Sequence, residues 1–163
     1  MIIDTMEVNV LIDEGFEGCV EASWLERMAE KVLEEQGADS RVELSLVIAS
    51  QEKVRRLNLS YLEEDDPTDV LSFSMLSEQP GGDSGSFVAP PDGVQHLGEV
   101  IISYPQAVIQ AEEHRHSVKR EIAILIIHGT LHLLGYDHDN PEMEREMRTQ
   151  EAKILNYIKG ELE

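Results

Sequence analysis

A strongly apolar segment in the C-terminal third of the chain constrains the fold more than any other feature. Residues 118–134 are apolar at most positions, and Gly135 follows them directly. Glycine just past the last apolar turn is typical of a helix end. The longest unbroken apolar run, Ile122 to Ile127, is far too short to cross a bilayer. The sequence therefore predicts a helix over Val118–Leu134, which we expect to be the most buried helix of the protein.

The end of this predicted helix carries the stretch HGTLHLLGYDH, from His128 to His138. His128 and His132 lie one helical turn apart, so their side chains leave the same face about 6 Å from each other. Two imidazoles at that separation can bind one zinc ion at about 2.0–2.1 Å each. Gly135 ends the helix, and the returning chain can bring His138 to the same point. The spacing predicts one zinc ion per chain on these three histidines, with a fourth position left for water, as in catalytic sites.

The alternative is that these histidines are structural side chains of a buried helix. Two neighbouring imidazoles buried without partners are costly, because neither can become charged easily. This cost favours the metal site over the structural interpretation.

The residue after the first histidine is Gly129. The H-x-x-x-H-x-x-G-x-x-H spacing is that of metzincin zinc peptidases, which carry their glutamate base at this position. Asp137 is the nearest acidic candidate for a base, but we favour a role for it in orienting a ligand imidazole through a hydrogen bond. Phosphodiester cleavage depends less on a fixed carboxylate, since a metal stabilises charge on phosphoryl oxygens directly. Gly129 therefore favours phosphodiester hydrolysis, or hydrolysis of another substrate, over peptide hydrolysis without deciding the reaction.

The remaining segments predict an α+β fold. Residues 7–12, 42–49, 70–75 and 97–103 are predicted strands. Further helices are predicted from Ser23 to Gly37, from Ser50 onward, from Tyr104 to about His116 and from Pro141 to about Lys159. The fold class that follows is a small mixed four-stranded sheet packed with about five helices, one of them a zincin-like metal helix. We expect residues 1–163 to form a single metal-dependent hydrolase domain.

Local patterns add detail to this outline. Ser23 and Glu26 have the spacing of a capping box. The second helix is predicted to turn three apolar side chains inward, namely Val54, Leu57 and Leu59.

Two connecting segments and a pair of histidines complete these expectations. Asp65-Asp66-Pro67 predicts a turn, and the glycine- and proline-rich stretch 77–95 predicts a long loop, a kind of segment that is often functional. His114 and His116, just ahead of the metal helix, are predicted to be exposed.

The charge balance excludes a general basic footprint for nucleic acid, because 33 acidic residues face 13 basic ones, a net charge of −20. Salt screens exposed charges over about 8 Å, so local basic clusters can still contact an anion. Two such clusters occur, Lys53/Arg55/Arg56 and Arg115/Lys119/Arg120. We predict substrate contacts for Arg55, Arg56, Arg115 and Lys119, the alternative being ordinary solvated helix faces.

The single cysteine excludes an internal disulfide and favours a reducing compartment. The N-terminus, MIIDTMEVNV, lacks the basic and apolar regions of a signal peptide. We therefore expect a cytoplasmic protein with no membrane partner.

The histidine stretch closely resembles the signature of the YbeY endoribonuclease family. Two other stretches are similar to that family in the right order: residues 57–73, with the core PTDVLSF from Pro67 to Phe73, and LGEVIIS from Leu97 to Ser103. The resemblance implies an α+β fold related to zinc peptidases, with zinc on His128, His132 and His138.

The same resemblance implies a single-strand-specific endoribonuclease that acts in rRNA 3′-end maturation and ribosome quality control. The implied partners are single-stranded rRNA, the small ribosomal subunit and assembly factors. The family pattern has an arginine where this chain has Leu62. Two other functions remain open from the residues, a metal-dependent hydrolase of another substrate such as a peptide, and a ribosome assembly factor whose metal is mainly structural.

Overall fold

The computed structural model describes residues 6–37, 42–62, 69–74, 95–136 and 140–162. Its strands are β1 (Met6–Ile12), β2 (Val42–Ala49), β3 (Val70–Ser74) and β4 (Gln95–Ser103). Its helices are α1 (Ala22–Glu35), α2 (Gln51–Leu62), α3 (Tyr104–His114), α4 (Val118–Leu133) and α5 (Pro141–Tyr157), followed by a short 3-10 turn, η1 (Lys159–Leu162). The predicted α+β class, with a four-stranded sheet and five helices, is confirmed.

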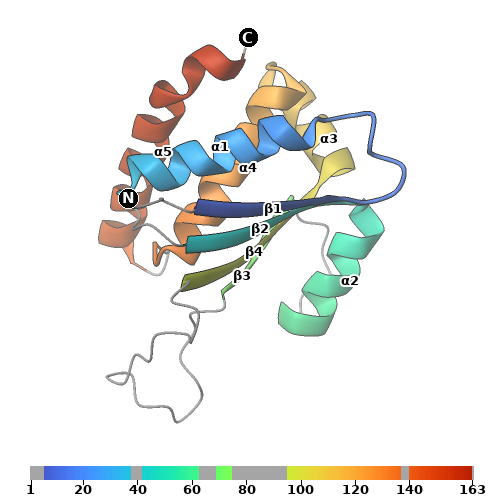
Figure 1. The fold of residues 1–163 in the computed structure, drawn as a ribbon, viewed down its shortest axis with the longest axis horizontal. Helices are drawn as coiled ribbons and strands as arrows, with labels where there is room; N and C mark the ends of the chain where they lie inside the picture. The colour runs from blue at the N-terminus through green and yellow to red at the C-terminus, as the bar shows by residue number, and fades with distance from the viewer. Residues whose placement is uncertain (1–5, 38–41, 63–68, 75–94, 137–139, 163) are drawn as a thin grey trace, which may run out of the picture.

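The four strands form one mixed sheet in the order β1-β2-β4-β3. The pairs β1–β2 and β2–β4 are parallel, whereas β3 pairs antiparallel with β4 at one edge. The helices divide between the two faces of this sheet, with α2 on the side opposite α1, α4 and α5 (Figure 1).

Alternation along β2 explains how both faces become covered. Leu44, Leu46 and Ile48 point into the main core, which also contains buried residues of α1, α4 and α5. Val47 and Ala49 point to the other face and pack with residues of α2, β3 and β4. Helix α4 contributes ten buried residues, from Glu121 to Leu133. The segment predicted to be the most buried helix is therefore a central part of the main core.

Several predicted helix boundaries are confirmed by their hydrogen bonds. The Ser50 hydroxyl accepts from the backbone N–H of Lys53 at 3.1 Å, and the Asn140 side chain accepts from Met143 N–H at 2.8 Å. Gly135 follows α4 with φ +110°, a conformation that favours glycine. These contacts satisfy backbone groups that a helix end leaves without partners.

Two local predictions are wrong. Helix α1 begins at Ala22 after Glu21, with no side-chain cap, so Ser23 lies inside the helix instead of forming a capping box. Leu59 is 49% exposed, whereas Val54 is buried. Residues two apart on a helix point about 200° from each other, so α2 cannot turn both Leu57 and Leu59 toward the sheet.

Strand β4 begins at Gln95, two residues before the predicted start. The predicted turn at 65–67, residues 77–94 of the predicted loop and Met75 lie outside the described residues. In the part of the chain that the structure describes, no helix is long and apolar enough to cross a membrane.

Candidate functional site

The C-terminal end of α4 presents two imidazoles side by side. The rings of His128 and His132 have their centroids 4.7 Å apart and stand nearly perpendicular, at 79°. The helix ends directly after them, because Gly135 N–H donates to the His132 carbonyl at 3.1 Å and Tyr136 N–H donates to the Leu131 carbonyl at 3.0 Å. These bonds turn the chain back sharply at the glycine.

Each of these imidazoles is held through its Nδ1 atom. His128 Nδ1 lies 2.8 Å from Glu151 Oε2, and His132 Nδ1 lies 3.0 Å from the carbonyl oxygen of Tyr136. A carboxylate and a carbonyl only accept hydrogen bonds, so both Nδ1 atoms carry the proton. In the neutral ring this leaves the lone pair on Nε2, the tautomer in which histidine binds a metal through Nε2.

Sequence reasoning missed Glu151. It lies on α5, far along the chain from His128, and many other acidic residues of this chain were equally good candidates for a partner. Asp137, the acid favoured from the sequence for such an orienting role, lies outside the described residues, as does His138.

A pocket of about 320 Å³ opens between the histidines and the edge strand β3. Its lining from the strand consists of Val70, Leu71, Ser72 and Ser74, and its lining from α4 consists of His128, His132 and Leu133. The pocket therefore lies where a substrate can approach both imidazoles from the edge of the sheet.

Gly129 marks the closest approach of α4 to the sheet. A Cβ atom there would lie 2.7 Å from Val100 Cγ1 and 3.1 Å from Ser72 Oγ. The Ser72 hydroxyl instead donates to the Gly129 carbonyl at 3.2 Å. The position that holds the glutamate base in metzincin peptidases thus has no room for a side chain in this packing.

The structure does not bring the predicted basic residues together with His128 and His132. Arg55 and Arg56 are exposed on α2, across the sheet from α4. Arg115 is exposed after α3, with φ 59°, and Lys119 lies on the first turn of α4 over the Trp24 ring, 5.3 Å from its centroid. Leu62 is the last residue of α2, and its side chain lies outside the described part of the chain.

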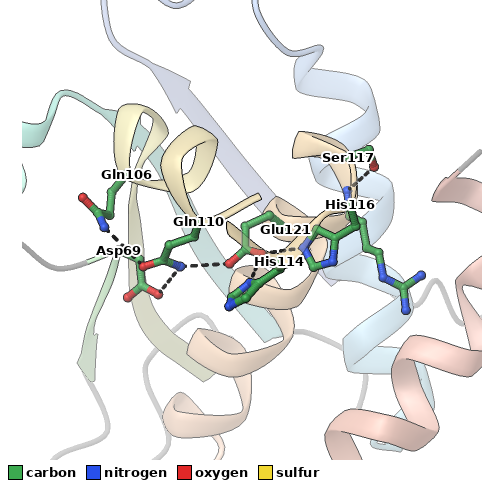
Figure 2. A network of polar contacts seen from close by, with 8 residues as sticks. Asp69, Gln106, Gln110, His114, His116, Ser117 and Glu121 are labelled. Atoms are coloured by element: carbon green, nitrogen blue, oxygen red, sulfur yellow. Dashed lines mark hydrogen bonds and ion pairs between the residues drawn. The ribbon is translucent and has the colours of Figure 1, made fainter. Parts of the chain in front are cut away.

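A second group of ligand-type side chains lies around the N-terminal end of α4. One ligand atom from each of His114, His116 and Glu121 lies within 4.8 Å of the others, so this set, here named the Glu121 cluster, is a candidate metal-binding group (Figure 2). The expectation that both histidines are exposed is wrong for His116, whose side chain is only 20% exposed. His116 is drawn inward because it bonds the buried carboxylate of Glu121, a tertiary contact that local sequence does not reveal.

The Glu121 carboxyl remains ionised in this setting. Burial raises its pKa, but hydrogen bonds from His114, His116 and Gln110 and the charge of His114 outweigh burial, so that the net pKa lies below the ordinary value. The side chain is only 2% exposed, which makes this a buried anion stabilised by its neighbours.

Comparisons with known proteins define the class of this chain. The family model described as "Endoribonuclease YbeY" matches residues 17–159. A relative from Dehalococcoides mccartyi strain BAV1, described as "Endoribonuclease YbeY", is 46% identical over 160 residues, which cover 97% of this chain and 100% of the relative. One from Roseiflexus castenholzii with the same description is 42% identical over 152 residues, which cover 93% of this chain and 92% of the relative.

The fold has a counterpart among solved structures. The solution structure of TM1509 from Thermotoga maritima matches with a TM-score of 0.56 at 22% identity, covering 94% of this chain and 93% of that one. The chain belongs to the YbeY endoribonuclease family, and it is an endoribonuclease, that is, a hydrolase.

Proposed function

We propose that this chain is a zinc-dependent, single-strand-specific endoribonuclease that acts in rRNA 3′-end maturation and ribosome quality control. We further propose that residues 1–163 form one hydrolase domain and that its partners are the small ribosomal subunit and assembly factors. The rRNA substrate and these partners are carried over from the family.

The observation that carries the metal assignment is the anchoring of both Nδ1 atoms. Glu151 and the Tyr136 carbonyl fix the tautomer and orientation of His128 and His132, as partners of metal-binding histidines commonly do. A pair of imidazoles with free Nε2 lone pairs would suit zinc, and His138 is the proposed third ligand. When bound, a zinc ion supplies positive charge that stabilises the developing phosphoryl anion, and it acidifies a water molecule.

The surrounding residues favour a phosphodiester over a peptide. The close packing of Gly129 against Val100 leaves no side chain at the position of the peptidase base. We assign Asp137 to orienting a ligand imidazole and leave proton transfer to water and the phosphate oxygens. Arg55, Arg56, Arg115 and Lys119 lie away from the pocket, so they are proposed contacts for a strand that extends beyond it.

Cleavage of a labelled single-stranded RNA, with a duplex of the same sequence as control, tests this function. Wild-type protein should cut the single strand only, a chelator should abolish cutting, and His132→Ala should lower its rate by about 10³-fold. His96→Ala removes a histidine that pairs with Glu43 and does not line the pocket, so it should cut normally. Undiminished cutting by a folded, metal-free His132→Ala protein would overturn the proposal.

A further inference from the structure

The Glu121 cluster joins the end of one helix to the beginning of the next. His114 is the last residue of α3, His116 lies in the connection, and Glu121 lies in the first turn of α4. One carboxylate oxygen, Glu121 Oε1, is 3.1 Å from His114 Nδ1 and 2.6 Å from His116 Nε2. Three potential ligand atoms from three different backbone settings therefore converge on one small volume (Figure 2).

The types of donor atom in this volume match a zinc site. Two imidazole nitrogens and one carboxylate oxygen form a ligand set that zinc uses in proteins. Without metal these two nitrogens donate to the Glu121 carboxylate, so zinc binding replaces both hydrogen bonds and each ring gives up the proton from its ligating nitrogen. Tetrahedral bonds of 2.0–2.1 Å place ligand atoms about 3.4 Å apart. The atoms of the Glu121 cluster lie within 4.8 Å of one another, so closure onto an ion needs shifts of only about 1 Å. The His114 side chain is 55% exposed and has the space to make such a shift.

The carboxylate is held in place from behind by a second set of contacts. Gln110 Nε2 donates to Glu121 Oε2 at 2.9 Å and to Asp69 Oδ2 at 3.0 Å. Gln110 thus engages the oxygen that faces away from the imidazoles and leaves Oε1 directed at them. Supporting contacts of this kind are typical of ligating carboxylates. A bound cation would also stabilise the cluster, because it would offset the negative charge of the buried Glu121 carboxylate.

We propose that His114, His116 and Glu121 bind a second zinc ion, separate from the centre at His128 and His132. Glu121 and His128 are seven residues apart on α4, about 10.5 Å along the helix axis at 1.5 Å per residue. Paired catalytic metals lie about 3.5–4 Å apart, so the second ion cannot share a substrate atom with the first. Its role is structural, because it ties the end of α3 to the start of α4 and, through Gln110, to Asp69 before β3.

The test counts zinc ions in the full-length protein. Wild type, His132→Ala, His114→Ala and the double variant are dialysed against Zn²⁺, then against buffer, and analysed for metal. We expect two equivalents in wild type, one in each single variant and none in the double variant. His114 is exposed, so its truncation leaves the core packing intact, and His96→Ala should retain two equivalents.

The His132→Ala background separates this proposal from the proposed function. In that background Zn²⁺ should raise the unfolding temperature, and the isosteric change Glu121→Gln should remove the rise. A folded His132→Ala protein that retains no zinc would overturn the second site. One equivalent in wild type that is lost with His114→Ala and kept with His132→Ala would instead support the second site and overturn the proposed catalytic centre.

Discussion

A pair of histidines lies at each end of α4, and the two pairs differ in how they are held. At the C-terminal end, His128 and His132 donate hydrogen bonds from their Nδ1 atoms to Glu151 and to the Tyr136 carbonyl, respectively. At the N-terminal end, His114 and His116 each turn a ring nitrogen directly onto one oxygen of Glu121. The two imidazoles of the first pair are therefore oriented by two separate acceptors, whereas those of the second pair share one carboxylate oxygen.

This difference matches the roles proposed for the two pairs, a reactive site for the first and a structural one for the second. The first pair lines a pocket beside the edge strand, where a substrate can enter. The second pair closes a connection between helices and anchors a buried anion. The Glu151 carboxylate thus orients an imidazole at one end of the helix, whereas the Glu121 carboxylate is a potential ligand at the other. Substitutions at the C-terminal end should mainly affect catalysis, and those at the N-terminal end should mainly affect stability.

The largest expected contrast is in catalysis. His132→Ala should lower the rate of RNA cleavage by about 10³-fold, because the charge stabilisation contributed by a metal amounts to several kcal/mol. His116→Ala, at the other end of the same helix, should lower it less than about tenfold, since it affects only the scaffold. Single-turnover cleavage of one RNA by both folded variants measures the contrast. Equal losses would show that the two ends act as one site.

The next effect concerns the support of His128. Glu151→Ala removes the acceptor of the Nδ1 proton and should weaken zinc binding at the three-histidine centre by about 10–100-fold. Glu151→Gln keeps an acceptor oxygen and should lose less. Competition with a chromophoric chelator, carried out in the His114→Ala background, reports this centre separately. An unchanged zinc affinity in Glu151→Ala would show that the contact between Glu151 and His128 does not support metal binding.

The sequence predicted much of this molecule where the determinants were local. The apolar run and Gly135 predicted α4 and its end, and Ser50 and Pro141 predicted the starts of two helices. The strand order β1-β2-β4-β3 was not predicted, because strand pairing depends on contacts between distant segments.

The candidate site shows the same division. The spacing of His128 and His132 follows from one helical turn, so it could be predicted from the sequence. Glu151 and the partnership of His116 with Glu121 depend on how α5 and α3 pack, so no local pattern revealed them. The role of Gly129 could be predicted only in part. The sequence shows that the glutamate base of the peptidases is absent, but not that Val100 packs against Gly129 where a side chain would lie.

A smaller effect tests the packing that distinguishes the C-terminal end. Gly129→Ala should lower the free energy of unfolding by about 1–3 kcal/mol, because the new Cβ would lie 2.7 Å from Val100 Cγ1. Gly160→Ala is the matched control, since a Cβ at Gly160 meets no atom within 4 Å. Urea unfolding of both variants gives the comparison. A Gly129→Ala protein as stable as wild type would show that α4 can move away from β4.

The smallest effect is a pH dependence at the N-terminal end, measured in metal-free protein. The pKa of Glu121 is lowered in the folded state, so its ionised form contributes stability that is fully present above its ordinary value of 4.5 and is lost as the pH falls through the folded pKa. Wild type should therefore exceed Glu121→Gln in unfolding free energy at neutral pH by about 1 kcal/mol, the size of one net hydrogen bond. The difference should shrink below the ordinary carboxyl pKa.

Urea unfolding at a series of pH values, with a chelator present throughout, measures this difference. Gly160→Ala provides the control, because it removes no titratable group and its new Cβ meets no atom within 4 Å. Its stability difference from wild type should vary little with pH. If the difference in unfolding free energy between wild type and Glu121→Gln were instead constant from neutral to acidic pH, the charge of the carboxylate would not contribute to stability. The buried anion would then not distinguish the two ends of α4.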